Sequence, residues 1–559
     1  MKRTVKLPAF VFNPVHSDNI TEEVIKRQDD ILKLEFPVFE KDEVLEIAHQ
    51  LNFRKRRAHN RSIENILEVI DQVGHLWRNP NYDIRKETIE LLPMITGQSQ
   101  RLCEIELNGT LILWEKKYAE GQLNGELGGK MFLDEWILKN NVRLHAQPRG
   151  VVLHNLAGNA FNLGMLSLFY GLVTKNVNLI KLSHEEPLVT VKLCETISDV
   201  DKKIAKEIAA LYWRGSNFDI YDSLFQSSYI DTVLAWGGIN SIEDIRRRAY
   251  QYGIKIINHG PKMSFAIVSE DYFKSIEQMR KIAFKVAFDT VFWNQKACLS
   301  PRVIYIVENT HSPTFYQKNE IFNDDSIKFR DSLPFSDALN NTSDQVNYND
   351  YNLSELMQRS IKTLKNNITE ISPYGFAKMI AEGMKKADEF LPQENLTQAD
   401  GMEVAKKRQY FFRNYVSKKR GKIITPINSG LNWTVVFLRD LPNAREIDMC
   451  QNRFLIITRV SSINDLIYSI RNEKLHQYLQ TISVLGSDDF IKHIAEEFSL
   501  LGAFRFPRIG EHNIQSIGTP WDGHYVLQDM IKWVYISFVE KENDGENGRI
   551  NMFDGFPSY

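Results

Sequence analysis

The sequence contains few cysteines, four among 559 residues, and none of them stands close to another. This spacing excludes zinc sites and redox motifs that are built from paired cysteines, and a disulfide framework is not expected in a chain of this length. Each cysteine is therefore either a small buried hydrophobic residue or a reactive thiol. The four are Cys103, Cys194, Cys298 and Cys450.

Long hydrophobic runs are also absent. No stretch reaches the roughly 18 apolar residues that a membrane-spanning helix needs, and the longest one, near Leu163 to Val173, is interrupted by glycine and serine. The first residues, Met1 to His16, lack the apolar core of a secretory signal peptide. We expect a cytoplasmic protein without a membrane span.

An excess of basic residues is missing as well. The formal net charge is -2, and 43% of the residues are hydrophobic, which is typical of a globular protein and does not favour nucleic-acid binding. The length predicts two or three domains. One basic segment, 401–424, is either a solvated face or a docking patch for an acidic carrier protein or for coenzyme A phosphates.

The sequence has no GxGxxG motif, yet strands and helices alternate from Gly150 onward. We predict a strand–turn–helix–strand unit over 151–182, in which the two strands must be parallel and the crossover right-handed. Further strands are expected at 208–213, 232–236 and 253–257, with helices at 218–226 and 240–251. Such a sheet binds ligands outside the carboxyl ends of its strands. The corresponding loops start at Ala157, Leu182, Arg214, Gly237 and Asn258.

We divide the chain into four parts. Residues 1–145 are expected to be mainly helical, because apolar residues recur at three- and four-residue spacing near 19–33, 42–53, 60–76 and 85–95. Residues 146–259 form the parallel-sheet core, 260–485 the domain that carries Cys298, and 486–559 a segment that completes the fold. Within the third part we predict a strand at 263–268, a helix at about 271–287 and a long surface loop at 309–350. The tail after about residue 540 is expected to be an extension.

Two polar residues follow the first strands of the predicted sheet. Asn159 lies in the turn before a helix, where its amide could donate to an oxyanion or merely cap the helix. Lys181 ends the second strand, where it could reach a phosphate or ribose hydroxyl or simply face solvent. The residues alone leave both alternatives open.

Cys298 lies just before an apolar strand, in a polar setting that includes Lys296. Polar neighbours and a nearby lysine could lower the pKa of the thiol and favour the thiolate. A thiolate is suited to exchange with a thioester, because the leaving group is itself a thiolate. This chemistry alone does not distinguish Cys298 from Cys194.

Several ordered strings together resemble the LuxC-type acyl-CoA reductases, the fatty-acid reductase subunit of bacterial bioluminescence, which belong to the aldehyde dehydrogenase superfamily. The similarity keeps its order and spacing over roughly residues 60–530. The strings are LGGKMFLDEW (Leu127 to Trp136), Leu156 to Asn159, Lys175 to Ser183, Tyr212-Trp213, Ala235 to Gly238, Gly260 to Lys262 with Ser264-Phe265, Ala287 to Gln295 with Ala297-Cys298, and Thr481 to Val484.

The resemblance implies an α/β fold like that of aldehyde dehydrogenases, with a Rossmann-like parallel-sheet cofactor domain and an α/β catalytic domain. It implies that Cys298 is the nucleophile, and that Asn159 stabilises the oxyanion together with the backbone N–H of Cys298. Lys181 and Ser183 match the segment that holds the adenosine ribose of the cofactor. The turn Trp236-Gly237-Gly238 matches one that passes near the cofactor, and no metal is implied.

Two departures from the superfamily pattern bear on the reaction. Asn258 stands where aldehyde-oxidising members usually carry a glutamate that activates water, so an acyl-enzyme here should survive long enough to be reduced. His184 stands where NAD-preferring members usually have glutamate, which favours NADPH, although Glu185 and Glu186 follow directly.

We therefore expect NADPH-dependent reduction of a long-chain acyl thioester to the aldehyde through an acyl-cysteine. The acyl donor would be acyl-CoA or an acyl-carrier or acyltransferase partner, and the superfamily implies a homo-oligomer. Two alternatives are an oxidising NAD(P)-dependent aldehyde dehydrogenase and a non-catalytic scaffold in an acyl-transfer complex.

Overall fold

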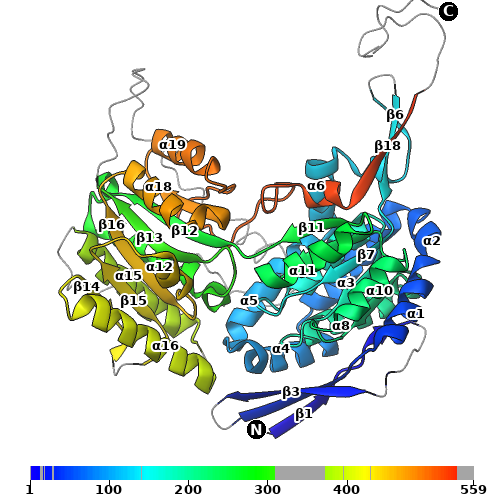
Figure 1. The fold of residues 1–559 in the computed structure, drawn as a ribbon, viewed down its shortest axis with the longest axis horizontal. Coiled ribbons are helices and arrows are strands. Elements are labelled where there is room, and N and C mark those ends of the chain that lie inside the picture. Colours follow the sequence, from blue (N-terminus) through cyan, green and yellow to red (C-terminus); the bar gives the residue numbers. More distant parts are fainter. Residues whose placement is uncertain are drawn as a thin grey trace, which may run out of the picture.

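A computed structural model describes residues 2–12, 17, 19–27, 30–139, 142–308, 372–393, 396–427 and 430–537. The described chain forms two α/β lobes, each built on its own six-stranded sheet (Figure 1). The surface loop predicted at 309–350 and the extension predicted after about residue 540 lie outside the described residues.

The first lobe contains the predicted parallel sheet. Its strand order is β11-β10-β7-β8-β9-β2, and the five longer strands are parallel to one another. Every residue of β7, β8 and β10 is buried, as expected for central strands covered by helices on both faces. The strands are β7 (Val151–Asn155), β8 (Val177–Lys181), β9 (Ile208–Leu211), β10 (Thr232–Trp236), β11 (Lys255–His259) and the antiparallel edge strand β2 (Phe10–Val11).

The order of these strands fixes the place of a ligand crevice. From β7 the chain adds β8 and β9 on one side and then β10 and β11 on the other. The direction of winding therefore reverses between β7 and β10, and open α/β sheets bind ligands at such a switch point. The helices that connect these strands are α7 (Leu163–Val173), α8 (Leu188–Val200), α9 (Lys202–Ala205), α10 (Phe218–Gln226) and α11 (Ile239–Tyr250).

The N-terminal region is only partly as predicted. Three helical segments are confirmed, but the helix expected at 19–33 is wrong, because β3 and β4 pair there as an antiparallel hairpin and β1 joins β4 in parallel. Burial along β4 alternates, with Leu32, Leu34 and Phe36 turned inward. The elements are β1 (Lys2–Lys6), β3 (Ile20–Arg27), β4 (Asp30–Pro37), α1 (Lys41–Asn52), α2 (Lys55–His59), α3 (Ile63–Arg78), α4 (Asp83–Thr96), α5 (Gln100–Thr110), η1 (Leu111–Trp114), α6 (Lys116–Leu127) and η2 (Lys130–Leu133).

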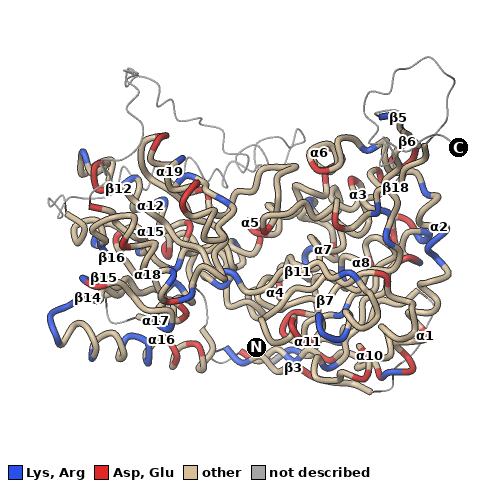
Figure 2. The backbone as a smooth tube through the Cα atoms, turned by 45° about the horizontal axis from the view of Figure 1, so that its top comes forward, with Lys and Arg blue, Asp and Glu red and all other residues tan. Residues whose placement is uncertain are grey.

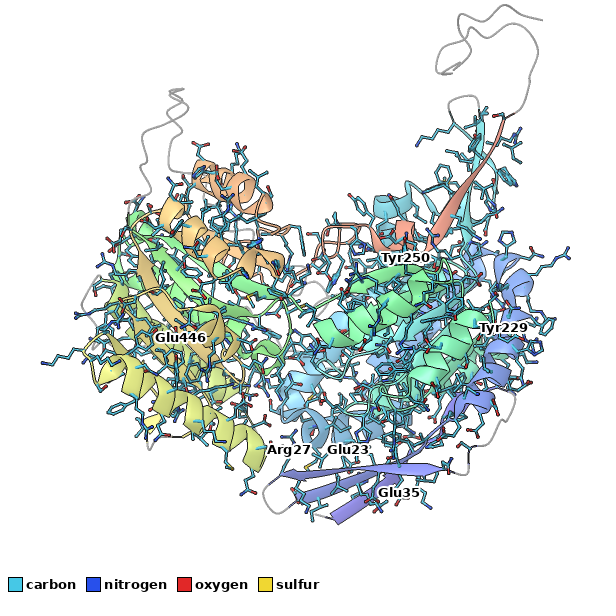
Figure 3. All side chains as sticks on the ribbon, viewed as in Figure 1. Glu23, Arg27, Glu35, Tyr229, Tyr250 and Glu446 are labelled. Atoms are coloured by element: carbon cyan, nitrogen blue, oxygen red, sulfur yellow. The ribbon has the colours of Figure 1, made fainter. Side chains whose placement is uncertain are left out.

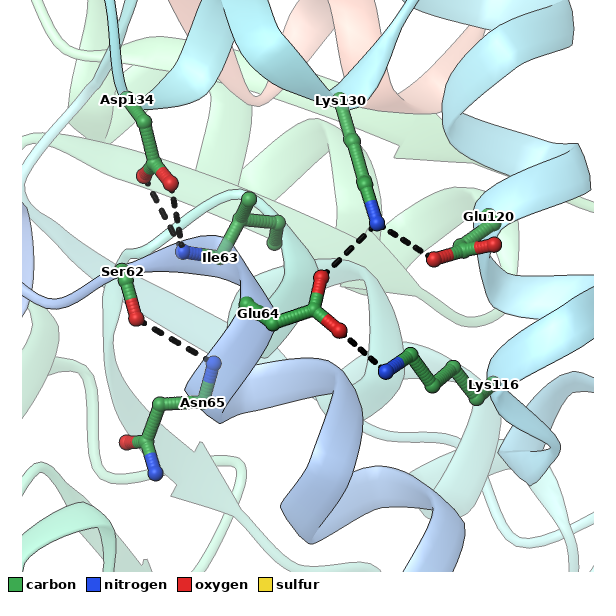
Figure 4. A network of polar contacts seen from close by, with 8 residues as sticks. All are labelled: Ser62, Ile63, Glu64, Asn65, Lys116, Glu120, Lys130 and Asp134. Atoms are coloured by element: carbon green, nitrogen blue, oxygen red, sulfur yellow. Dashed lines mark hydrogen bonds and ion pairs between the residues drawn. The ribbon is translucent and has the colours of Figure 1, made fainter.

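The string LGGKMFLDEW belongs to a packing site of the first lobe (Figure 4). Its Lys130 lies 2.8 Å from Glu64 and 2.5 Å from Glu120. Its Asp134 accepts from the first backbone N–H of α3, at Ile63, at 3.0 Å. This string therefore fixes the start of α3 against α6.

The second lobe is built on the sheet β14-β15-β16-β13-β12-β17, in which β14 is the antiparallel edge. The strand and helix predicted after residue 260 are confirmed as β12 and α12. The strands are β12 (Met263–Ser269), β13 (Pro301–Val307), β14 (Gly421–Ile424), β15 (Thr434–Leu438), β16 (Phe454–Val460) and β17 (Leu479–Leu485). The helices are η3 (Glu270–Tyr272), α12 (Ile276–Val291), η4 (Phe292–Gln295), α15 (Pro373–Phe390), α16 (Gln398–Phe411), η6 (Phe412–Val416), α17 (Ala444–Asp448), α18 (Ile463–Asn472), η8 (Leu475–Gln477) and α19 (Asp488–Ser499).

After α19 the chain returns to the first lobe (Figure 1). There α20 (Val526–Asp529) leads into β18 (Ile531–Ser537), which pairs antiparallel with β6 (Val142–Pro148), and β5 (Ile137–Lys139) completes this sheet. Acidic and basic residues are interspersed over both lobes (Figure 2). None of the described helices combines the length and apolarity needed to cross a membrane.

Candidate active site

Asn159 and the segment of Cys298 come together although they belong to different lobes. Asn159 follows β7, and its side-chain Nδ2 donates to the backbone carbonyl of Lys296 at 3.4 Å. Lys296 stands two residues before Cys298, in the turn between η4 and β13. The fold thus places the predicted oxyanion donor beside the segment that carries the predicted nucleophile.

The glycine before Asn159 is required by close packing. A Cβ atom on Gly158 would lie 2.6 Å from the Ser183 hydroxyl and 2.7 Å from Glu185. A side chain here would push the turn away from the end of β8. Gly158 therefore lets the turns after β7 and β8 lie against each other at the carboxyl edge of the sheet.

Lys181 ends β8 with its side chain buried. It forms no ion pair with the described residues, and its amino group lies 5.9 Å from the centre of the Tyr212 ring. Burial lowers the pKa of the Lys181 ammonium to about 8. A buried cation without a counter-ion is costly, so Lys181 fits a phosphate or ribose hydroxyl of a bound cofactor. Ser183 lies beside it, and its hydroxyl accepts from the backbone N–H of Glu185 at 3.3 Å.

The turn Trp236-Gly237-Gly238 ends β10, across the switch point from Asn159. The Trp236 indole is only 7% exposed; its N–H donates to the Ser167 hydroxyl at 3.2 Å. It is therefore part of the core, and the two glycines form the open part of the turn. A Cβ atom on Gly238 would meet nothing within 4 Å, which leaves room for a ligand before the N-terminus of α11.

An acidic residue of the N-terminal sheet reaches the predicted cofactor segment. Glu23 of β3, labelled in Figure 3, lies 2.9 Å from Nδ1 of His184. Glu23 thus places a carboxylate beside His184, the position at which a glutamate was expected in NAD-preferring enzymes. This contact weakens the electrostatic argument that His184 favours a 2′-phosphate.

Cys298 differs from the other three cysteines. Cys103, Cys194 and Cys450 are completely buried, whereas Cys298 is partly exposed. Its carbonyl accepts from the Ser264 hydroxyl at 2.8 Å, which ties it to β12. Exposure therefore separates Cys298 from Cys194, which the sequence alone could not do.

The turn before Cys298 has an unusual backbone. Trp293, Asn294 and Gln295 have φ values of 55°, 47° and 61°. Three successive non-glycine residues in the left-handed region are costly and persist only when their surroundings hold them. Such strain is often found at functional sites.

Buried partners hold this turn, and the sequence did not reveal them. Glu106 of α5 accepts from the backbone N–H of Trp293 at 2.7 Å. Arg453 donates to the side-chain oxygen of Asn294 at 3.0 Å. The Gln295 side chain accepts from the backbone N–H of Phe454 at 2.6 Å. The strained residues are therefore bound from both lobes.

Cys298 is partly exposed as a residue, but the protein shields its thiol from bulk water; this desolvation, and then the negative charge of Asp522, raise the pKa of the thiol to about 11. The expectation that Lys296 lowers this pKa is wrong, because burial and the carboxylate outweigh any nearby cation. A hydrogen bond from Gln480 acts in the opposite direction: its Nε2 lies 3.3 Å from the sulfur.

Gln480 connects the thiol to two further groups. Its Nε2 also donates to Oδ1 of Asp522 at 2.6 Å, and Oδ2 of Asp522 lies 2.6 Å from Nδ1 of His259. The His259 ring stacks on Trp236 at 3.9 Å between ring centres. Sequence reasoning missed Gln480, Asp522 and His259. Gln480 and His259 stand directly before the strings that begin at Thr481 and Gly260, whereas no such signal marks Asp522.

The structure also shows the surroundings of Asn258. Asn258 lies in β11 and is exposed, directly before the buried His259. Its amide is not a base. The position at which a glutamate was expected in aldehyde-oxidising enzymes thus holds an amide, which does not titrate.

Comparison with known proteins identifies relatives. A family described as "Acyl-CoA reductase (LuxC)" matches residues 58–316 and 362–533. The chain is 29% identical over 308 residues to the long-chain acyl-protein thioester reductase of Photobacterium phosphoreum, a match that covers 55% of this chain and 60% of that protein. It is 31% identical over 267 residues to the long-chain acyl-protein thioester reductase of Aliivibrio fischeri, covering 47% of this chain and 53% of that protein.

Solved structures share the fold at low identity. Aldehyde dehydrogenase 21 of Physcomitrella patens matches with a TM-score of 0.63 at 12% identity, over 96% of this chain and 98% of that one. The NADP-dependent glyceraldehyde-3-phosphate dehydrogenase of Bacillus halodurans, solved with NADP, matches with a TM-score of 0.62 at 14% identity, over 95% and 99%. The predicted aldehyde dehydrogenase-like α/β fold is confirmed.

Proposed function

The chain belongs to the LuxC family of acyl-CoA reductases, and on that premise we propose that it reduces an acyl thioester to an aldehyde through an acyl group held on Cys298. The observation that carries the proposal is the contact between Asn159 and the Cys298 segment at the carboxyl edge of the sheet. The aligned stretches span little more than half of the relatives' length, so the substrate and partners of the whole protein are part of the proposal.

The first step is transfer of the acyl group to the protein. The Cys298 thiolate attacks the carbonyl carbon, a carbon–sulfur bond forms, and the bond to the carrier sulfur breaks, so that the carrier leaves as a thiolate. Asn159 and the backbone N–H of Cys298 donate to the oxyanion that forms during this exchange.

The second step reduces the acyl group. A nicotinamide cofactor, when bound, supplies the hydride. Lys181 and Ser183 would hold its ribose, and Gly237-Gly238 would let it pass close to the backbone. The bond to the Cys298 sulfur then breaks and the aldehyde leaves. Overall, one hydride and one proton are taken up.

The absence of a base at Asn258 favours reduction over hydrolysis. Without a group that activates water, the acyl-cysteine persists until hydride arrives. An oxidising aldehyde dehydrogenase would consume aldehyde with NAD(P)⁺ in the absence of a thiol acceptor, and a non-catalytic scaffold would bind no NADPH. Both alternatives are excluded if the purified protein forms aldehyde from acyl-CoA and NADPH.

Cofactor choice, acyl donor and assembly are separate parts of the proposal. We propose NADPH, although Glu23 and Glu185 place carboxylates near His184; rates at matched NADPH and NADH concentrations decide this. The relatives' names favour a long acyl chain on a protein carrier, so acyl-CoA and acylated partner protein are compared as donors. A homo-oligomer is expected, and sedimentation measures it.

The decisive experiment is covalent labelling with radioactive acyl-CoA. Wild-type protein should retain label through denaturation, and Cys298→Ala should retain none. Cys194→Ala is the matched control, because Cys194 is completely buried in α8. Label that persists in Cys298→Ala contradicts the proposal.

A further inference from the structure

Gln480 is the side chain that contacts the Cys298 sulfur from β17. Its amide nitrogen touches both the sulfur, at 3.3 Å, and the Asp522 carboxylate, at 2.6 Å. A carboxylate only accepts hydrogen bonds, so the NH₂ end of the amide must face Asp522. The second hydrogen of the same NH₂ group is then available to the sulfur.

The carboxylate that orients this amide is itself held in place. Burial alone would raise the pKa of Asp522, but hydrogen bonds from His259 and Gln480 and the positive charge of Lys262 keep it below its ordinary value. Asp522 therefore stays ionised at neutral pH. Burial lowers the pKa of His259 despite its bond to Asp522, so the neutral ring donates through Nδ1.

His259 has no freedom to turn away from Asp522. Its side chain is 1% exposed, and its ring lies between Trp236, at 3.9 Å, and His524, at 5.3 Å. Its Nε2 is buried and has no hydrogen-bond partner among the described residues. A ring packed on both faces fixes the direction of its N–H bond, and through it the position of the carboxylate.

We propose that Gln480 is a further catalytic residue, an N–H donor to the Cys298 sulfur, and that Asp522 and His259 are positioning residues that fix the orientation of its amide. This role deepens the proposed function and rests on it for its place in the reaction. The donor stabilises the sulfur anion twice: before attack on the thioester, and when the bond between sulfur and the reduced carbon breaks. We call Gln480, Asp522 and His259 the relay; none of their covalent bonds changes during the reaction.

The test measures alkylation of Cys298 by iodoacetamide as a function of pH, with the labelled peptide quantified by mass spectrometry. Only the thiolate reacts, so the alkylation rate follows the fraction of Cys298 that is ionised. The midpoint of the rate profile is the pH at which half of the thiol is ionised. The charged groups around the thiol are Asp522 and Arg505; the neutral His259 and the charged Lys262 lie behind Asp522. Gln480→Met keeps the length of the side chain and removes the donor. We expect alkylation at pH 8 to slow about tenfold and the midpoint to rise by about one unit.

The positioning role of Asp522 is tested by coupling. In a Gln480→Met background, Asp522→Asn removes only a negative charge and should lower the midpoint. In the wild-type background it also releases the amide, so the midpoint should fall less, or rise. Equal shifts in the two backgrounds overturn the positioning role, and an unchanged rate in Gln480→Met overturns the donor role.

A matched control and a second variant keep the outcome clear. Asp440→Asn alters a carboxylate that pairs with Arg420 at 2.8 Å and contacts neither Gln480 nor His259, and it should leave the alkylation profile unchanged. If Gln480→Met fails to fold, Gln480→Glu replaces it; a second carboxylate beside Asp522 should raise the midpoint further, and an unchanged midpoint contradicts the proposal. Alkylation needs no acyl substrate, so it tests the role of Gln480 separately from the proposed function. An unchanged alkylation profile contradicts the role of Gln480 even if Cys298 is labelled by acyl-CoA, and a changed profile supports that role even if acyl labelling fails.

Turnover supplies the last readout. In Gln480→Met we expect kcat to fall with little change in the KM for the cofactor, because Gln480 lies at the thiol and not at Lys181. Loss of cofactor binding with an unchanged thiol would contradict the relay and indicate a general structural defect.

Discussion

Lys181 combines a positive charge with nearly complete burial, and its amino group has no acidic partner among the described residues. Because burial sets the pKa of its ammonium at about 8, the proton is present below that pH and is lost above it. A ligand that carries phosphate or ribose hydroxyls should therefore bind more weakly as the pH rises through this range.

The prediction for this residue is a pH-dependent affinity. Lys181→Met should weaken NADPH binding about tenfold at pH 7 and remove the decline between pH 7 and pH 9.5, since a hydrogen bond to a charged donor is lost. Fluorescence titration measures both quantities. Lys192→Met is the control, because Lys192 pairs with Glu87 and Glu195 on the outer side of α8. Identical pH profiles for wild type and Lys181→Met would argue against a cofactor role.

Asn159 is exposed, so its replacement should affect chemistry and not stability. Asn159→Ala should slow acyl-enzyme formation roughly 10²–10³-fold, the usual cost of losing one oxyanion donor. Rapid-quench labelling measures this rate, and the thermal midpoint should stay within error of wild type. Asn162→Ala, which removes an amide bonded to Thr110, serves as the comparison. A rate close to wild type would leave Asn159 with only a local structural role.

At the scale of an element, the turn 293–295 depends on buried charges. Arg453 is completely buried and donates to Asn294, to Asp388 at 2.9 Å and to the Leu391 carbonyl at 2.8 Å. Its charge also faces Glu106. One guanidinium therefore holds the strained turn and pairs with Asp388, whereas burial raises the pKa of Glu106 to about 8.

Removal of that guanidinium should destabilise the protein strongly. Arg453→Met leaves the partly buried Asp388 without its cation and the strained Asn294 without its donor, and should lower the free energy of unfolding by about 3–5 kcal/mol. Urea denaturation measures the loss. Arg302→Met, which removes a pair with the exposed Asp448, should cost at most about 1 kcal/mol. Equal losses in the two variants would show that the network around Asn294 contributes little.

Elements whose patterns are local could be predicted from the sequence. The unit β7–α7–β8 was predictable because its strands are mainly apolar and a turn signal separates the first strand from an apolar helix. The segment 19–33 was not, because its apolar residues also match a helical spacing, and pairing with β1 and β4 decides the outcome. Tertiary pairing outweighs local preference there.

The same distinction applies to the site. Cys298 and Asn159 could be proposed because each lies in a recognisable string. Gln480, Asp522 and His259 come from separated parts of the chain, and only the fold brings them to one sulfur atom. The pKa of the thiol was predicted in the wrong direction for the same reason: Lys296 is adjacent in sequence, whereas the burial and the Asp522 charge come from distant segments.

At the scale of the whole molecule, the N-terminal sheet packs against the first lobe. Val5, Leu34 and Phe36 belong to the same hydrophobic core as α3 and α7. Arg27, labelled in Figure 3, donates to the carbonyl of Ile95 at 2.9 Å, near the end of α4. The strands β1, β3 and β4 lie before the first position of the family match, at residue 58, whereas the match to aldehyde dehydrogenase 21 covers 96% of this chain.

The hydrogen bond from Asn159 to Lys296 crosses from one lobe to the other. A small rotation of one lobe relative to the other would break this contact, while the hydrogen bonds within each sheet would remain. Enzymatic activity should therefore be lost at a lower urea concentration than the secondary structure measured by circular dichroism, and it should return immediately when the urea is diluted. If activity and circular dichroism are lost at the same urea concentration, the two lobes unfold together as one cooperative unit.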